Sequence, residues 1–237
     1  MAKPELVARV VGSIGEIAAS EWDGLLAAQR TPSPFMRHAY LLAMEASGSA
    51  VPESGWHSRF VTLWRGKTLL AACPLYLKAH SYGEYVFDWA WANAYGEHGL
   101  EYYPKAVVAV PFTPVPGPRL LARDAPSRAA LVQALVAYCR QEGLSSLHLL
   151  FCDPDDEAAC DEAGLMHRHT VQFHWLNQGW RDLDAFLASL SHEKRKKIRQ
   201  ERRKVHDAGV EFRWARGSDI SPEGWDFFYR WYARTYR

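Results

Sequence analysis

The order of strand-like and helix-like patterns constrains the fold of this chain more than any other feature of its sequence. Apolar residues alternate over 57–64 and 68–77, and the three residues between these runs favour a hairpin. Further along, helical periods over 125–142 and 154–163 alternate with short β-rich runs, as they do where a helix connects two parallel strands. An antiparallel start followed by such crossovers predicts the α/β class with a mixed sheet.

The predicted elements extend over nearly the whole sequence. Strands are expected over 5–11, 57–64, 68–77, 105–110, 146–151 and 166–176, with another after Gly209. Helices are expected over 14–29, 33–47, 125–142, 154–163 and 192–208, with a short one that ends at Ser191. Asp124 and Ser191 are good N-cap residues, and Gly143 and Gly209 lie where a helix end needs positive φ.

Residues 81–105 are rich in tyrosine and tryptophan without a stable period, and we expect neither helix nor strand there. A carboxylate among aromatic side chains can have a raised pKa and accept a proton near neutral pH. The candidate catalytic residues are therefore Glu84, Asp88 and His98, and the candidate substrate-binding residues of this segment are Tyr82, Tyr85 and Tyr103. The alternative is that these aromatic residues only cover a core.

The predicted helix over 192–208 concentrates positive charge. Eight Lys and Arg residues and two Glu residues lie between His192 and His206, a net charge of +6, whereas the whole chain has a net charge of +1. At 100° per residue the arginines occupy one broad face, opposite a narrow apolar stripe. This pattern favours an anionic ligand, with Arg195 and Arg199 as preferred phosphate ligands and Lys196 and Arg202 next. A solvated face on a helix between two domains is the alternative.

The composition and short motifs of the sequence indicate the cellular compartment and argue against two kinds of chemistry. No run approaches 18 consecutive apolar residues, and the first residues lack the apolar region of a signal peptide. The four cysteines form no C-x-x-C, so we expect a reduced, cytoplasmic protein without a membrane span. The spacing of Cys152, Cys160, His167 and His169 is unlike that of zinc sites, and no metal is expected. The sequence contains no G-x-S-x-G motif, so it does not indicate a serine hydrolase.

Four sequence blocks carry a resemblance to a known family. They are PLYLKAHSYGEYVFDWAWANAY (74–95), YYPKAVVAVPFTPVPGPRLL (102–121), HWLNQGW (174–180) and FLASLSHEKRKKIRQERRKV (186–205). In these blocks the chain resembles the FemAB-like family of predicted N-acyltransferases, which is related to peptidoglycan. The order of elements is similar to the fold that Gcn5-related N-acetyltransferases share with Fem-type enzymes. The first two blocks are the most specific.

The resemblance implies two tandem acyltransferase-like domains. Residues 1–170 would form the first domain, and residues 171–237 would be the start of an incomplete second domain that contains the basic helix. The acyl donor, acyl-CoA or aminoacyl-tRNA, would be a co-substrate bound in the second domain, without a tightly bound cofactor. We therefore expect little or no turnover from this truncated chain alone. Self-association, or docking on the first domain, is expected through Phe227, Phe228, Trp231, Tyr232 and Tyr236.

The activity that the resemblance implies is transfer of an acyl or aminoacyl group to an amine acceptor, for which a peptidoglycan precursor is a candidate. At the turn before the helix over 125–142, residues 119–124 lack the glycines of an acetyl-CoA site, so no phosphate cradle is expected there. A nucleic-acid module that binds tRNA through the basic helix, or a non-catalytic interaction domain, is the alternative. Outside the basic helix the chain has a net charge of −5, which disfavours a general nucleic-acid reader.

Overall fold

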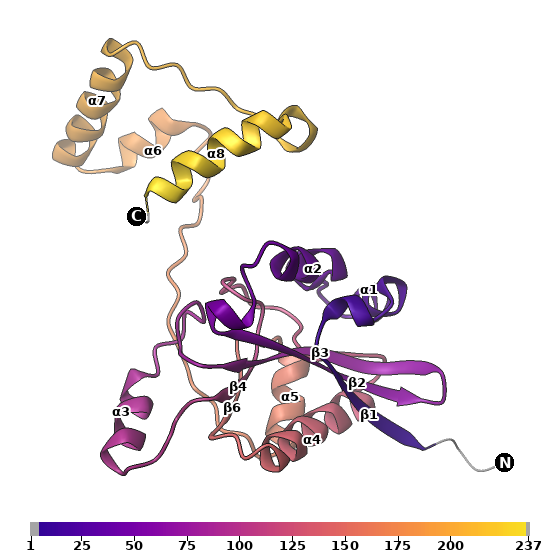
Figure 1. Ribbon diagram of the computed structural model, residues 1–237. Helices are drawn as coiled ribbons and strands as arrows, with labels where there is room; N and C mark the ends of the chain where they lie inside the picture. Colours follow the sequence, from indigo (N-terminus) through magenta and orange to yellow (C-terminus); the bar gives the residue numbers. More distant parts are fainter. Residues whose placement is uncertain (1–4, 236–237) are drawn as a thin grey trace. The chain divides into compact units, whose positions relative to one another are not determined.

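The computed structural model describes residues 5–235, and the chain divides into two compact units, residues 1–169 and residues 170–237. The first unit contains a six-stranded sheet (Figure 1). In this sheet β1 (Leu6–Val11), β2 (Trp56–Arg65), β3 (Thr68–Lys78) and β4 (Lys105–Val108) pair antiparallel in that order. β5 (Leu121–Ala122) also pairs antiparallel with β3, whereas β6 (Leu147–Leu149) runs parallel to β4. The predicted α/β class with a mixed sheet is confirmed.

Helices cover both faces of this sheet (Figure 1). α1 (Ala19–Ala27) and α2 (His38–Ala46) pack with Trp22 against Phe60 on one face. α4 (Ala125–Gln141) and α5 (Pro154–Glu162) pack with Leu135 against Val61 on the other. Successive residues of a strand point to opposite faces, so Phe60 and Val61 belong to two separate cores. The central strands are therefore buried on both sides, whereas the edge strand β1 is largely exposed.

Two predicted helices are shorter than the sequence pattern indicated. The prediction over 14–29 resolves into a 3-10 turn, η1 (Ile14–Glu16), followed by α1, and the prediction over 33–47 resolves into η2 (Pro34–Met36) followed by α2. Tertiary hydrogen bonds explain the breaks. The His38 backbone N–H donates to Asp23 Oδ1 at 2.9 Å, and the His38 ring nitrogen Nε2 lies 3.0 Å from the carbonyl oxygens of Ile14 and Ile17. These bonds satisfy backbone groups that a continuous helix would have paired.

The expectation of no helix within residues 81–105 is wrong, because α3 (Trp89–Glu97) lies there. Three of its nine residues are alanines, which favour helix. None of its residues is buried, so the helix has no apolar stripe that a periodic pattern could reveal. A short 3-10 turn, η3 (Pro52–Ser54), also precedes β2.

Two predicted strands are wrong. Residues 166–176 and 210–214 contain no strand, and Phe173 and Phe212 are 95% and 81% exposed. An alternating pattern forms a strand only where a neighbouring strand accepts its backbone hydrogen bonds. No strand occurs between residues 170 and 235, so these segments have no such neighbour within their own unit.

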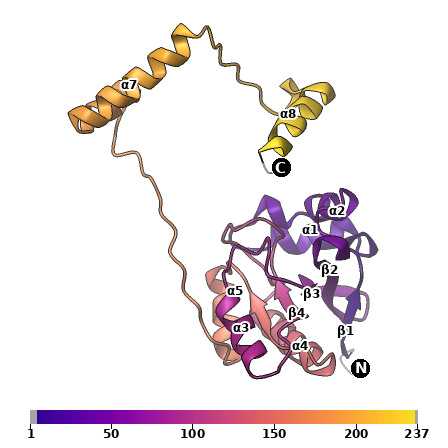
Figure 2. The same ribbon diagram turned by 60° about the vertical axis from the view of Figure 1, so that its left-hand side comes forward.

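The second unit consists of helices joined by extended segments (Figure 2). It contains α6 (Leu183–Ser189), α7 (His192–Asp207), the 3-10 turn η4 (Gly217–Asp219) and α8 (Pro222–Arg234). The predicted basic helix is confirmed as α7, with Ser191 Oγ accepting from the Lys194 backbone N–H at 3.5 Å and Gly209 at φ +71°. Over residues 5–235, no helix has the length and apolar character that crossing a membrane requires.

Candidate active site

Two buried lysines lie opposite each other where the chain leaves the sheet and returns to it. Lys78 ends β3, Lys105 begins β4, and the two residues are paired in the antiparallel register. Neither side chain is exposed. Two like charges placed side by side in a core are unfavourable unless other groups compensate them. The segment between the two lysines supplies the compensating groups.

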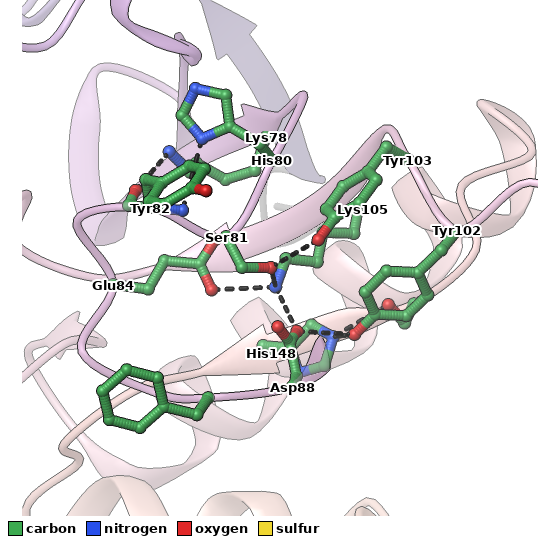
Figure 3. Close-up of polar contacts among 12 residues, drawn as sticks. Lys78, His80, Ser81, Tyr82, Glu84, Asp88, Tyr102, Tyr103, Lys105 and His148 are labelled. Atoms are coloured by element: carbon green, nitrogen blue, oxygen red, sulfur yellow. Dashed lines mark hydrogen bonds and ion pairs between the residues drawn. The ribbon is translucent and has the colours of Figure 1, made fainter. Parts of the chain in front are cut away.

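The Lys105 ammonium group is the centre of a buried polar cluster (Figure 3). It donates hydrogen bonds to Ser81 Oγ and to Glu84 Oε2, each at 2.8 Å, and to Asp88 Oδ2. All three partners are buried. An ammonium group has three N–H donors, so every donor of Lys105 is used. The geometry holds both carboxylates in fixed positions.

Lys78 has fewer partners than Lys105. Its ammonium group donates to the Tyr82 backbone oxygen at 3.2 Å and lies 3.7 Å from the centre of the Trp56 ring. Burial, together with the nearby charge of Lys105, lowers the pKa of Lys78 to about 8, although Glu84 acts in the opposite direction. Lys78 therefore loses its proton far more readily than an exposed lysine.

The two carboxylates differ in proton affinity. Burial raises the pKa of Glu84 above its ordinary value, even though Lys105 opposes the shift. Burial also acts to raise the pKa of Asp88, but hydrogen bonds from Lys105, Ser81 and Tyr102 outweigh it and hold that pKa below its ordinary value. Glu84 Oε1 and Asp88 Oδ1 are buried, and within residues 5–235 neither has a hydrogen-bond partner. Such oxygens are rare in folded proteins and can accept a hydrogen bond from a ligand.

A second group of side chains extends from Asp88 through Tyr102 to His148 on β6. The Tyr102 hydroxyl donates to Asp88 Oδ2 at 2.7 Å and lies 3.2 Å from His148 Nε2. His148 Nε2 is also 2.8 Å from Ser146 Oγ. Burial and the charge of Lys105 lower the pKa of His148 to about 4, so its ring is neutral at neutral pH.

The basic helix α7 is the second region with candidate binding residues. A groove of about 520 Å³ along it is lined by His192, Arg195, Lys196, Arg199, Gln200 and Arg203. Two of the predicted phosphate ligands contact α6: Arg195 donates to the Ala188 backbone oxygen at 3.5 Å, and Arg199 lies 3.8 Å from Asp184 Oδ1. Arg202 is exposed and borders a neighbouring groove with Phe212.

The family model for FemAB-like proteins, described as peptidoglycan biosynthesis/recognition, matches residues 13–237. The chain belongs to the FemAB-like family. The resemblance stated from the sequence blocks is thereby confirmed. A search of curated proteins found no match.

Two solved structures are similar to this FemAB-like chain at low identity. A ribosomal-protein-alanine N-acetyltransferase from Brucella melitensis biovar Abortus 2308 is 13% identical, with a TM-score of 0.41, over 73% of this chain and 100% of that one. A GCN5-related N-acetyltransferase from Ralstonia eutropha JMP134 is 14% identical, with a TM-score of 0.37, over 74% of this chain and 100% of that one.

The turn before α4 does not fit the phosphates of acyl-CoA, one of the two donors expected from the sequence. The Asp156 carboxylate already accepts from the backbone N–H groups of Arg119, at 2.5 Å, and Leu120, at 3.2 Å. Asp124 Oδ1 accepts from the Ser127 backbone N–H at 2.8 Å and so caps the helix. Since the protein's own carboxylates occupy the donors that would bind a phosphate, the first unit offers no anion site at this turn.

The structure brings together some of the predicted site residues and separates others. Glu84 and Asp88 share Lys105, and the Tyr103 hydroxyl lies 2.8 Å from Ser81 Oγ in the same cluster. Tyr82 and Tyr85 are 68% and 55% exposed on the segment that covers the cluster. His98 is exposed at the end of α3, where its Nδ1 lies 2.8 Å from the Ala94 backbone oxygen, and it does not contact the cluster.

Sequence reasoning missed the residues that organise this cluster. They are Lys78, Ser81, Tyr102, Lys105 and His148. The sequence did contain a signal for the two lysines, because each stands at one end of an apolar strand pattern. A lysine in such a position is expected to be buried and to need a charged or polar partner. Among residues 5–235, no group of three or more His, Cys, Asp or Glu side chains is placed to hold a metal ion.

Proposed function

We propose that this FemAB-like protein is an N-acyltransferase that transfers an acyl or aminoacyl group to an amine, with a peptidoglycan precursor as the acceptor. Membership of a family described as peptidoglycan biosynthesis/recognition supports the acceptor class. The buried carboxylate cluster supports amine chemistry, because N-acyl transfer needs a group that takes a proton from the attacking nitrogen.

The observation that carries this proposal is the environment of Glu84. Its Oε2 is held by Lys105 at 2.8 Å, while its Oε1 has no partner in the described chain. Burial raises its pKa, so it takes up a proton more readily than an exposed glutamate. A carboxylate that is fixed on one side and unpaired on the other can accept the proton of an amine. Because this oxygen is buried, the proposal requires the covering segment to move and admit the amine. Asp88, which has the lower pKa, stays ionised and balances the charge of Lys105.

The reaction then follows in one sequence of bond changes. The neutral amine nitrogen attacks the activated carbonyl carbon of the donor, and a C–N bond forms. The nitrogen loses a proton to Glu84 Oε1. The bond between the carbonyl carbon and the leaving group breaks, and the leaving thiolate or alkoxide takes up one proton, which balances the proton that the nitrogen lost. Because no side chain is acylated, this scheme needs no nucleophilic residue in the protein.

The proposal assigns recognition of phosphate groups to α7. Its exposed arginines present planar guanidinium groups that bind phosphate oxygens through two hydrogen bonds. A nucleotide-linked precursor carries such phosphates and also an amine. In this proposal Arg195, Lys196, Arg199 and Arg202 of the second unit bind phosphate groups. Tyr82, Tyr85 and Tyr103 contact its apolar parts, and the catalytic assignment of His98 stays a prediction.

The test is acyl transfer by the whole chain with acetyl-CoA or aminoacyl-tRNA as donor and a nucleotide-linked peptidoglycan precursor as acceptor. Product is followed by mass spectrometry. We expect Glu84→Gln to lower the rate by roughly 10²-fold or more, as expected for loss of a general base. Glu101→Gln is the matched control, since Glu101 is exposed in the same segment. A Glu84→Gln rate equal to that of the wild type and of Glu101→Gln would refute the role of Glu84 in the proposal.

A tRNA-binding module is the second candidate, and the exposed charge of α7 favours it. Binding of uncharged tRNA with a steep salt dependence, without acyl transfer from any donor, would support this reading over the first.

A further inference from the structure

The proposed reaction forms a negatively charged oxygen as well as an amine proton. When the amine nitrogen attacks, an electron pair of the carbonyl bond moves to the carbonyl oxygen, and it returns when the leaving group departs. This oxyanion is stabilised by N–H or O–H donors that are already fixed near its position. A side chain with this role needs donors that the folded protein leaves unused.

Lys78 has unused donors. Its ammonium group has three N–H donors, and among residues 5–235 its only hydrogen-bond acceptor is the Tyr82 backbone oxygen, at 3.2 Å. Two donors are left without an acceptor, although the side chain is fully buried. Lys105, the neighbouring cation, differs because the buried cluster uses all three of its donors. Lys78 is thus the cation of this region that can bind a new acceptor.

Lys78 lies on the same face of the sheet as the cation that holds Glu84. Lys78 and Lys105 are paired in register on neighbouring strands, and paired residues point to the same face. Lys105 holds Glu84 Oε2 at 2.8 Å, and the charge of Glu84 acts on the pKa of Lys78. The oxygen that accepts from Lys78 belongs to Tyr82, two residues before Glu84 in the covering segment (Figure 3). A substrate that enters beneath this segment therefore meets a carboxylate and an ammonium group together.

The unsatisfied groups match the two polar atoms of the tetrahedral intermediate. The nitrogen of the intermediate carries a proton to be removed, and its oxygen carries a negative charge. Glu84 Oε1 is a buried acceptor without a partner in the described chain, whereas Lys78 offers unused donors. One side of the site therefore suits the nitrogen and the other suits the oxygen.

We propose that Lys78 donates hydrogen bonds to the oxyanion of the acyl-transfer intermediate, and that Trp56 holds the ammonium group of Lys78 in position. This inference rests on the proposed function and deepens it, because the oxyanion forms on the carbonyl that the amine attacks. Lys78 keeps its own proton throughout. The step therefore moves only the electron pair of the carbonyl bond and leaves the proton balance with Glu84 unchanged.

Trp56 holds Lys78 from the neighbouring strand β2. The two residues are paired in the antiparallel register, and Lys78 Nζ lies 3.7 Å from the centre of the indole ring. A cation over the face of an aromatic ring is attracted by the ring electrons. Because both residues belong to paired strands, Nζ keeps its place when the covering segment moves to admit the amine. A donor that is fixed in advance stabilises a developing charge without a cost of reorganisation.

The charges around Lys78 favour a negative charge beside it. The charged and titratable groups that face it are Lys105 on β4 and, from the covering segment, Glu84 and His80. Burial, together with Lys105, lowers the pKa of Lys78 to about 8, although Glu84 opposes the shift. An oxyanion beside Nζ also opposes it, so the lysine and the intermediate stabilise each other. At neutral pH most Lys78 side chains are protonated and able to donate.

Kinetics of variants test this role in the whole chain. Lys78→Met should lower kcat about 10²-fold with little change in KM, as expected for loss of an oxyanion donor. Trp56→Phe should lower kcat about 5-fold, because a phenylalanine ring attracts a cation less strongly. Trp64→Phe is the matched control, since the Trp64 ring holds Arg9 at 5.3 Å elsewhere on the sheet, and it should match the wild type. A folded Lys78→Met protein with the wild-type kcat would overturn the assignment.

The pH profile gives a readout that a purely structural lysine would not change. In the wild type kcat/KM should fall as pH rises through about 8, because neutral Lys78 is a weaker donor. Lys78→Met should lack this fall. The same profile in both proteins would contradict the role of Lys78.

A binding measurement on the wild type depends neither on turnover nor on the folding of a variant. The probe is a methylphosphonamidate formed on the amine of the nucleotide-linked precursor, in which a tetrahedral phosphorus carries an anionic oxygen and the nitrogen. NMR titration of labelled lysine side chains should show that the bound probe raises the pKa of Lys78, lowering its acid dissociation constant about 10-fold or more.

The outcomes separate this inference from the proposed function. A bound probe that leaves the pKa of Lys78 unchanged, or failure of the probe to bind, would overturn the oxyanion site. Failure of the proposed general base is recognised by a different result, a Glu84→Gln rate equal to that of the wild type.

Discussion

The buried lysines of the first unit and the basic helix of the second hold the same kind of charge in opposite surroundings. Lys78 and Lys105 are fully buried, and Lys105 has a partner for each of its donors. No residue of α7 is buried, and its ion pairs are long, such as Lys197 to Glu201 at 4.0 Å. The first region holds two cations in fixed positions, whereas in the second seven of the eight basic side chains are exposed and Arg195 is half-buried.

The difference shows what each charge can contribute. A buried ion pair fixes geometry and shifts pKa values, but removing one partner leaves an uncompensated charge in a medium that solvates it poorly. An exposed cation is screened by salt and contributes little to stability, yet it attracts anionic ligands from a distance. We therefore expect the first unit to carry proton chemistry and the second to carry salt-dependent binding.

The largest expected effect is on stability and concerns Lys105. Lys105→Met would leave Glu84 and Asp88 buried without a cation, and we expect the free energy of unfolding to fall by about 3–5 kcal/mol. Urea unfolding measures this loss. Lys196→Met, the same change on α7, should cost less than about 0.5 kcal/mol.

A compensated variant sharpens this contrast. Lys105→Met combined with Glu84→Gln and Asp88→Asn removes all three charges and should recover most of the lost stability, because the penalty comes from the unpaired carboxylates. If the triple variant is as unstable as the single one, packing of the lysine stem and not charge would explain the effect.

The second prediction concerns pH and Asp156, which is buried beside Arg128. Burial outweighs its two backbone donors and raises the pKa of Asp156 from 3.8 to about 7. The folded state then holds a proton that the unfolded state has released between pH about 4 and about 7, so the free energy of unfolding falls as pH rises across this window. We expect the wild type to lose about 2–4 kcal/mol relative to Asp156→Asn between these limits.

Urea unfolding of both proteins at pH 4.5 and 7.5 checks this prediction. The depressed pKa of His148 has the opposite sign, because it makes the folded state more stable as pH rises above about 4. Both proteins share that contribution, so it cancels in their difference. Equal pH dependence in the two proteins would show that Asp156 is ionised in the folded state across this range.

The third prediction addresses the exposed charges. Replacing Arg195 and Arg199 together by Ala should weaken binding of a nucleotide-linked precursor by about 10-fold and reduce its salt dependence, with little loss of stability. Lys197→Ala with Lys204→Ala is the matched control, since it removes the same charge from the opposite face of α7. Calorimetric titration at two salt concentrations distinguishes a local site from an effect of net charge. Equal weakening by both pairs would exclude a site on the arginine face.

The smallest expected effect concerns α8. Phe228 and Trp231 are more than half exposed, and exposed aromatic groups favour association. Phe228→Ser with Trp231→Ser should lower the average mass measured by analytical ultracentrifugation at high protein concentration. A wild-type chain that stays monomeric at every concentration would contradict self-association. Tyr236, named with them from the sequence, lies outside the described residues.

The sequence predicted most of the first unit because its elements are defined by local signals. The hairpin of β2 and β3 follows from strand alternation, and the helix α4 follows from its Asp124 cap. In the second unit, the basic helix α7 follows in the same way from its Ser191 cap. The strands expected after residue 165 were wrong because their formation depends on a partner elsewhere in the fold. Local pattern does not reveal whether such a partner is present.

The candidate site was predictable only in part, for a related reason. Glu84 and Asp88 were identified because carboxylates among aromatic residues are unusual. Lys105 and His148 were missed because they lie on different strands, and only the register of β3, β4 and β6 brings them to the acidic segment. The pKa of Glu84 is raised, as expected from the sequence. The pKa of Asp88 is lowered instead, because three side chains donate hydrogen bonds to it.

The pairing of Lys78 with Lys105 has a consequence for how this protein can vary. The segment that carries the acidic and aromatic residues starts after Lys78 and ends before Lys105, which are paired on neighbouring strands. The pairing of β3 with β4 therefore does not depend on the length of this segment. Closing a longer loop costs little more free energy than closing a shorter one. Residues 79–104 can therefore vary in length and sequence while the strands stay the same. A related chain with a different segment here could bind a different acceptor, provided that the segment again places acidic groups beside the two lysines.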